Sequence, residues 1–142
     1  MRVTTGWYGN EYFVVKPLHN GCRQELIMTT WAEGGGRYSI SAGVFSCSTT
    51  YESFNRSSAW ISPTSTNKNP SIETLTVALE ALTEIEEEIH RTANGKRRWV
   101  YVDGMDTRRL RVYTKVLTKK CGYKKSKKIS TFCGLPLVFK QI

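Results

Sequence analysis

Hydrophobic and polar residues alternate along the first third of the chain, the pattern that predicts half-buried β-strands. The segments Tyr12–Lys16, Arg23–Trp31 and Arg37–Cys47 show it most clearly, and Pro17 is expected to end the first. Short connections that contain asparagine or glycine separate the three segments, namely His19–Gly21 and Glu33–Gly36. We therefore predict an antiparallel meander of three strands.

The spacing of apolar residues changes to three and four between residues 69 and 95, which predicts a long amphipathic helix. Asn69 and Pro70 are typical of a helix start, and Asn94–Gly95 of its end. The predicted buried stripe is Ile72, Leu75, Leu79, Leu82, Ile85 and Ile89. The polar segment before this helix contains one short predicted strand, Ala59–Ile61.

A strand followed by a basic helix comes next. Trp99–Val102 is apolar on both faces, as expected for a central strand covered by helices. Asp106 is placed to cap the next helix, and Gly122 to end it. The predicted buried stripe of this helix is Leu110, Tyr113, Val116, Leu117 and Cys121.

Two closing strands, Lys128–Phe132 and Leu137–Gln141, complete the predicted elements. Their order along the chain is β-β-β-β-α-β-α-β-β. We predict an α+β fold with a mixed, mostly antiparallel sheet and two main helices. No repeat or low-complexity linker divides the 142 residues, so residues 1–142 are expected to form a single domain.

The composition favours a cytoplasmic protein. No apolar run approaches the roughly 20 residues that span a bilayer, and the N-terminal segment lacks the apolar region of a signal peptide. The four cysteines have no metal-site spacing, so we expect free thiols, mostly in the core: Cys22, Cys47, Cys121 and Cys133. We predict no metal site and no membrane association.

Positive charge is concentrated in the last third of the chain. Residues 1–94 contain seven basic and ten acidic residues, a net charge of −3, whereas residues 95–142 contain fourteen basic and two acidic residues, a net charge of +12. Such a field favours an anionic partner, either a nucleic acid, a nucleoprotein or an acidic protein surface, although a solvated face is the alternative. The predicted binding residues are Lys96, Arg97, Arg108, Arg109, Arg111, Lys115, Lys119, Lys120, Lys124, Lys125, Lys127 and Lys128, with Tyr123 as a base-stacking residue. For Tyr123 the alternative is a hydrophobic closure of the helix end.

Acidic residues crowd the C-terminal end of the long helix, where the helix dipole disfavours them. They are Glu84, Glu86, Glu87 and Glu88. Either they form a solvated acidic face, which is the favoured interpretation, or they meet part of the basic C-terminal surface or a partner. We assign no catalytic residue: His19 and His90 are expected at the surface, and capping accounts for Asp106.

From Ala59 to Ile142 the chain resembles the GCN5-related N-acetyltransferases. Ile61–Pro63, a polar loop and a leucine-rich helix are similar to that family's strand, pyrophosphate loop and first cofactor-contacting helix. The segment Leu117–Tyr123 resembles the ending of its second helix. The resemblance implies the family's fold, and acetyl-CoA as the cofactor if the protein is an enzyme.

The residues that this family uses for catalysis are altered here. Its glycine-rich pyrophosphate loop corresponds to Thr66–Ser71, and the chain has no glycine between Gly43 and Gly95. The family's tyrosine general acid corresponds to Thr118, while Tyr113 is expected in the core.

We therefore expect a protein without catalytic activity or cofactor that binds an anionic partner. By analogy it would be an accessory protein of a phage or mobile element that modulates or inhibits a host complex. The alternative is an acyl-CoA-dependent N-acetyltransferase whose pyrophosphate contacts are Asn67, Lys68, Asn69 and Ser71. A third interpretation is an assembly protein that uses Trp7, Tyr8 and Trp60 as contact residues. The oligomeric state is left open.

Overall fold

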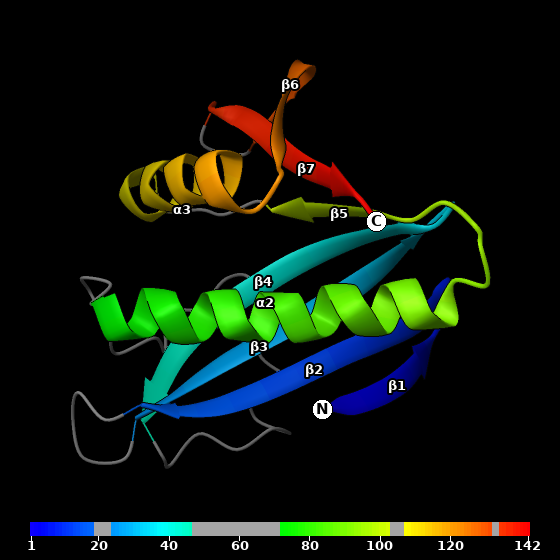
Figure 1. Ribbon diagram of the computed structural model, residues 1–142, viewed down its shortest axis with the longest axis horizontal. Coiled ribbons are helices and arrows are strands. Elements are labelled where there is room, and N and C mark those ends of the chain that lie inside the picture. The colour runs from blue at the N-terminus through cyan, green and yellow to red at the C-terminus, as the bar shows by residue number, and fades with distance from the viewer. Residues whose placement is uncertain (19–23, 47–71, 103–106, 132–133) are drawn as a thin grey trace.

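A seven-stranded mixed sheet with two helices packed against it makes up the computed structural model, which describes residues 1–18, 24–46, 72–102, 107–131 and 134–142 (Figure 1). The strands are β1 (Arg2–Gly6), β2 (Gly9–Leu18), β3 (Gln24–Gly34), β4 (Arg37–Ser46), β5 (Trp99–Val102), β6 (Lys124–Ser130) and β7 (Pro136–Gln141). The helices are α2 (Ile72–Thr92) and α3 (Thr107–Lys120). The order in the sheet is β1-β2-β3-β4-β5-β7-β6. The predicted α+β class with a mixed, mostly antiparallel sheet is confirmed.

The first four strands are antiparallel neighbours, so the predicted meander is confirmed. Strand β1 was not predicted. Its sequence, RVTTG, has no apolar stripe, and it pairs with β2 through a two-residue turn, Trp7–Tyr8, between Gly6 and Gly9. The strand therefore depends on hairpin pairing rather than on a buried face, and a hydrophobic pattern does not reveal it.

Pro17 was expected to end β2, and this prediction is wrong. The proline lies inside the strand and pairs with Glu25 of β3. Proline lacks the amide hydrogen that a central strand would donate on one side. The pairing of β1 with β2 extends only from Gly9 to Phe13, so Pro17 lies beyond it. The proline is tolerated because β2 has the character of an edge strand at that point.

Strand β5 lies in the interior of the sheet, parallel to β4 and antiparallel to β7. Its bounds and its central position are as predicted. Val100 and Val102 are buried, whereas Trp99 and Tyr101 are half-buried, so only one of its two apolar faces is fully covered.

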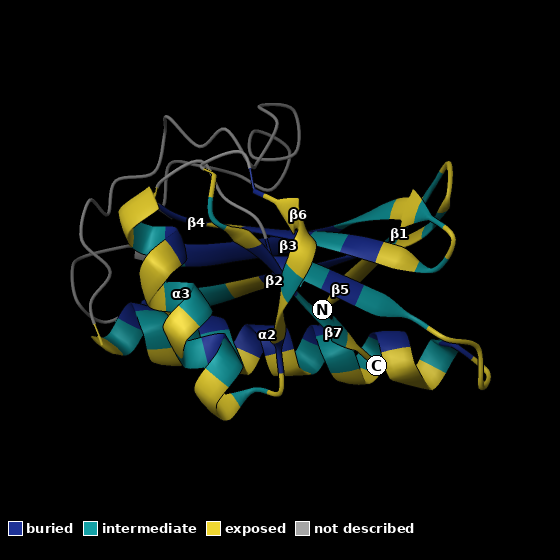
Figure 2. Cartoon of the chain, turned by 90° about the horizontal axis from the view of Figure 1, so that it is seen from above, coloured by how far each residue is buried: buried dark blue, intermediate teal, exposed yellow. Residues whose placement is uncertain are grey.

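Helix α2 crosses the face of β2 and β3 and buries one stripe against them (Figure 2). The predicted stripe is correct for its C-terminal half and wrong for its first turns, because Ile72 is 87% exposed. The observed stripe is Thr74, Ala78, Ala81, Leu82, Ile85 and Ile89. The two alanines have short side chains, which let the helix approach the sheet closely.

The end of α2 is also as predicted. Asn94 and Gly95 have φ angles of 52° and 78°, the left-handed conformation that stops a helix. The helix ends at Thr92 immediately before them.

Helix α3 contributes to the same core through Leu117, and its Tyr113 and Cys121 pack against that core while half-buried. The predicted buried stripe is confirmed for Leu110 and Leu117, whereas Tyr113 and Val116 are half-buried, as is Cys121, which follows the end of the helix. Strand β6 begins at Lys124, four residues earlier than predicted. The prediction missed this start because the lysine-rich sequence resembles a polar loop.

Several predictions lie outside the described residues. They are the strand Ala59–Ile61, the helix start at Asn69–Pro70, the cap Asp106, and the positions of Cys22, Cys47, Cys133, His19 and Trp60. Among the described residues, no helix combines the length and the apolarity that crossing a bilayer requires.

Candidate anion-binding surface

Helix α3 presents a cationic outer side. Leu110 and Leu117 anchor it to the protein, and its basic residues lie on the remaining surface. Arg108, Arg111, Lys115, Lys119 and Lys120 are exposed, and Arg109 is half-buried. The last two lysines stand at the C-terminal end, where the helix dipole favours positive charge.

The chain leaves α3 through Gly122, whose φ of 77° turns it toward β6. The amides of Cys121 and Tyr123 both donate to the carbonyl of Leu117, at 3.1 and 3.2 Å. The turn is therefore fixed by backbone hydrogen bonds, and it places the lysines of β6 directly after the cationic helix end.

Tyr123 is not part of the binding surface. Its side chain is 3% exposed, so the prediction that it stacks on a base is wrong, and the alternative of a closed helix end is correct. Its hydroxyl donates to Oε1 of Glu86 at 2.6 Å, and Lys140 Nζ donates to Oε2 of the same carboxylate at 2.9 Å. Burial, and then the charge of Glu86, raises the pKa of Tyr123. The ring is held inside by this network.

The same network corrects the interpretation of the acidic cluster on α2. Glu84 pairs with Lys16 of β2 at 2.6 Å, and Glu86 pairs with Lys140 of β7. Glu88 pairs with Arg91 on its own helix. Only Glu87 is an exposed member of the cluster without such a partner among the described residues. The favoured solvated face is wrong for Glu86, which meets the basic C-terminal part of the chain, whereas Glu84 and Glu88 form ion pairs and stay partly exposed.

Strand β6 forms one edge of the sheet and is exposed over nearly all its length. Lys124 and Lys125 pair with Phe139 and Val138 of β7, after which the register shifts before Ser130. All four of its lysines, Lys124, Lys125, Lys127 and Lys128, are exposed. In the part of the chain that the structure describes, none of the four forms an ion pair with a carboxylate.

Ser126 shapes the irregular part of β6. Its Oγ accepts hydrogen bonds from the amides of Lys128 and Ile129, at 3.2 and 3.0 Å. The bend thus fixes the backbone between the two lysine pairs. The sequence analysis did not predict this role, although serine side chains are known to accept hydrogen bonds from backbone amides two or three residues further along the chain in such turns.

The basic residues fall into two separate groups. Lys96 and Arg97 precede β5, whereas α3 follows it, and the two views place them toward opposite ends of that strand (Figures 1 and 2). The predicted set is therefore not one surface. We call the group on α3 and β6 the α3–β6 surface, which consists of Arg108, Arg109, Arg111, Lys115, Lys119, Lys120, Lys124, Lys125, Lys127 and Lys128.

Lysines on an edge strand also oppose strand-to-strand association, which would account for part of the β6 pattern. That explanation does not extend to α3, whose basic residues are not on a sheet edge. The continuation of positive charge from the helix onto the strand is what indicates an anionic ligand.

The residues of the acetyltransferase alternative are only partly described. Asn67, Lys68, Asn69 and Ser71 lie outside the described residues. The hydroxyl of Thr118 donates to the carbonyl of Thr114 at 2.7 Å, within its own helix. Its proton is therefore engaged in the backbone rather than directed at a substrate.

Metal and histidine chemistry find no support in the described part of the chain. No group of three potential metal ligands occurs there, and His90 is exposed as predicted.

Comparison of the chain with protein-family models, with curated proteins and with solved structures finds no match. The resemblance to GCN5-related N-acetyltransferases therefore stays a prediction.

Proposed function

We propose that this protein binds the phosphate backbone of a nucleic acid through the α3–β6 surface, without catalysing a reaction. The observation that carries the proposal is the exposure of Lys124, Lys125, Lys127 and Lys128 with no described carboxylate partner. Lysines that neutralise phosphates release counterions, and this release drives binding of any nucleic-acid sequence.

The internal arrangement of charge supports a ligand for these lysines. Lys140, on the neighbouring strand, has a carboxylate partner in Glu86, so the protein does use its acidic residues to balance positive charge. The β6 lysines are left without such balance. Binding through them would be directed at the backbone, because side chains that reach phosphates carry no sequence information.

The test is the salt dependence of binding to a labelled duplex and a labelled single strand, measured by fluorescence anisotropy. The affinity should fall with salt, and the double variant Lys127→Gln/Lys128→Gln should lower the slope of log K against log salt by about two. Because the two side chains are exposed, the variant should melt like the parent protein.

A matched control separates a local effect from total charge. The variant Val3→Glu/Thr5→Glu changes the net charge by the same two units on exposed positions of β1, at the other edge of the sheet. It should leave the slope for the duplex nearly unchanged. Equal effects of both double variants, or no salt-dependent binding at all, would contradict the proposal.

The second candidate is acyl-CoA-dependent N-acetyltransfer. The order α2, β5, α3, β6, β7 is compatible with the predicted resemblance and is the observation in its favour. Acetyl-CoA at millimolar concentration should then raise the melting temperature, because a ligand that binds only the folded state stabilises it. Unchanged melting would count against this candidate.

The role as a phage or mobile-element modulator in a host cytoplasm belongs to the first proposal and requires that a host nucleoprotein be captured.

A further inference from the structure

A polar cleft of about 250 Å³ lies away from the α3–β6 surface. Four segments distant in the sequence meet there: the β1–β2 turn, the β3–β4 turn, the end of α2 and the start of β5. They contribute Tyr8, Gly9, Asn10, Tyr12, Gly36, Tyr38, Thr92 and Arg98. Figure 1 shows these segments at the same end of the molecule.

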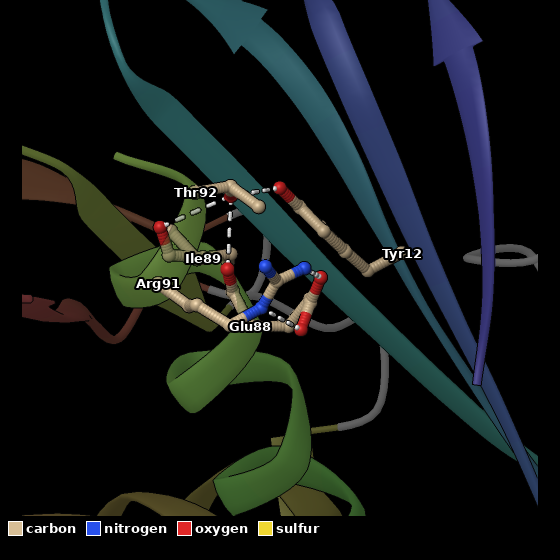
Figure 3. Close-up of polar contacts among 5 residues, drawn as sticks. All are labelled: Tyr12, Glu88, Ile89, Arg91 and Thr92. Atoms are coloured by element: carbon tan, nitrogen blue, oxygen red, sulfur yellow. Dashed lines mark hydrogen bonds and ion pairs between the residues drawn. The ribbon is translucent and has the colours of Figure 1, made fainter. Parts of the chain in front are cut away.

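The floor of the cleft is held by hydrogen bonds. Thr92 Oγ1 donates to the carbonyl of Glu88 at 2.9 Å and lies 2.8 Å from the Tyr12 hydroxyl, which can donate to it (Figure 3). The Tyr12 and Tyr38 rings pack with their centroids 5.9 Å apart. The carboxylate of Glu88 is engaged by Arg91, so it is already neutralised. These contacts within the chain hold the shape of the floor.

One aromatic side chain of the β1–β2 turn lines the cleft, and a second one precedes it in the same turn. Tyr8, which lines the cleft, is 71% exposed, and the adjacent Trp7 is 100% exposed. A Cβ atom at Gly34 would lie 3.4 Å from the Tyr8 ring, an ordinary van der Waals distance, so the β3–β4 turn lies beside the tyrosine. The fully exposed tryptophan and the largely exposed tyrosine beside it offer two π-faces to a ligand.

Cations occupy the other side of the rim. Arg98 lines the cleft, and the exposed Lys96 and Arg97 precede it. Nη1 of Arg98 donates to the carbonyl of Arg97 at 3.0 Å. A Cβ atom at Gly36 would lie 2.7 Å from that carbonyl and 3.1 Å from Nη1, and Gly36 also has a φ of 76°. A glycine is thus required for the basic segment to pack against the β3–β4 turn.

We infer that this cleft binds one nucleotide unit of a single-stranded nucleic acid, whose base stacks on Trp7 and Tyr8 and whose phosphate is bound by Arg97 and Arg98. Stacking platforms beside a positive groove are the means by which proteins hold single strands. The guanidinium groups match phosphate oxygens in geometry and charge. The volume is below that of sites for drug-sized ligands, which suits a single base better than a whole coenzyme.

This inference goes beyond the proposed function and does not depend on it. The α3–β6 surface would bind any phosphate backbone, paired or unpaired. The cleft requires an unpaired base, because a base within a duplex has no free face to offer.

The experiment uses a trinucleotide, fluorescein-labelled (dT)₃, and its abasic counterpart of the same charge, with anisotropy as the readout. The parent protein should bind (dT)₃ at least about fivefold more tightly than the abasic trimer, the lower bound for one stacked base. Trp7→Ala should reduce that preference, because only Tyr8 would still stack on the base, and it should leave abasic binding unchanged. Because Trp7 is fully exposed, its removal should not alter the melting temperature.

Two further variants locate the phosphate contact. Arg97→Gln should weaken both trimers more than Lys127→Gln/Lys128→Gln does. Three outcomes would overturn the inference: no preference for (dT)₃ over the abasic trimer, a preference that is undiminished in Trp7→Ala, or trimer binding that is lost in the β6 variant and retained in Arg97→Gln. The last outcome would place the trimer on the α3–β6 surface and leave the proposed function intact.

Discussion

Strands β7 and β6 are hydrogen-bonded neighbours, yet their lysines have opposite surroundings. Lys140 of β7 is paired with Glu86 of α2, and its ammonium group lies 5.7 Å from the centroid of the Tyr123 ring. Lys127 and Lys128 of β6 are exposed, and no described carboxylate pairs with them. Lys140 therefore contacts the protein interior next to α2, whereas Lys127 and Lys128 are exposed to solvent.

The difference shows that lysine has two roles in this protein, one in a structural ion pair and one on the exposed surface, which the composition of the sequence does not distinguish. A lysine whose stem lies against buried groups needs a charge partner, because an unpaired charge in a low-dielectric site is costly. A lysine on an exposed edge strand has no such need and remains available to a ligand. Substitutions on the two sides should therefore separate stability from binding.

The largest contrast is expected from one residue type in two places. Ile85 of α2 is 0% exposed, and Ile129 of β6 is 56% exposed. Ile85→Ala should lower the free energy of unfolding by about 2–5 kcal/mol through lost burial and the cavity left behind. Ile129→Ala should change it by less than about 0.5 kcal/mol. Urea denaturation measures both, and comparable losses would show that β6 is packed rather than exposed.

Removal of the Tyr123 hydroxyl should have the next largest effect. Tyr123→Phe deletes a buried hydrogen bond to a carboxylate, which typically contributes about 1.5–3 kcal/mol. Tyr101→Phe, on the half-buried face of β5, is the matched control and should cost less than about 0.5 kcal/mol. Equal midpoints in urea for Tyr123→Phe and the parent protein would mean that the Glu86 network does not stabilise the fold.

The same tyrosine predicts a pH dependence. Its pKa is raised in the folded protein, so folding favours the protonated hydroxyl, and this contribution is complete below the unfolded value of about 10. Above pH 10 the unfolded state loses the proton first, and stability should fall by up to about 1.4 kcal/mol per pH unit. Burial also raises the pKa of Tyr38, which acts in the same direction. Tyr123→Phe should therefore reduce the slope without abolishing it, and an unchanged slope would contradict the assignment.

The smallest effect should come from single lysines. Lys140→Gln should cost roughly 0.5–1 kcal/mol, since the lysine side chain is 30% exposed and solvent screens the pair. Lys125→Gln should leave stability unchanged but lower the salt slope of nucleic-acid binding by about one. Lys140→Gln should leave that slope unchanged. A single lysine substitution that changes both the stability and the salt slope of binding would contradict the distinction between Lys140 of β7 and the lysines of β6.

Local patterns were sufficient for much of the fold. The long helix, its end at Asn94–Gly95, the strand Trp99–Val102 and the meander follow from periodicity and from residues with strong backbone preferences. The misses share a cause. Strand β1 and the first half of β6 contain few apolar residues, so only their pairing with β2 and β7 reveals them.

The candidate site divides in the same way. The excess of positive charge and its location in the last third of the chain are visible in the sequence. Which cations are neutralised is not visible, because Glu86 and Lys140 are 54 residues apart and meet only when α2 lies across the sheet. The burial of Tyr123 has the same origin.

The sequence by itself determined most of the element types, the cationic character of α3 and β6, and the glycine positions that end the helices, because these depend on neighbours within a few residues. Tertiary structure alone decided that the basic residues form two groups, that Tyr123 is internal, and that Tyr8 and Arg98 line one cleft. Those outcomes depend on strand order and on the packing of α2, which bring together residues that are distant along the chain.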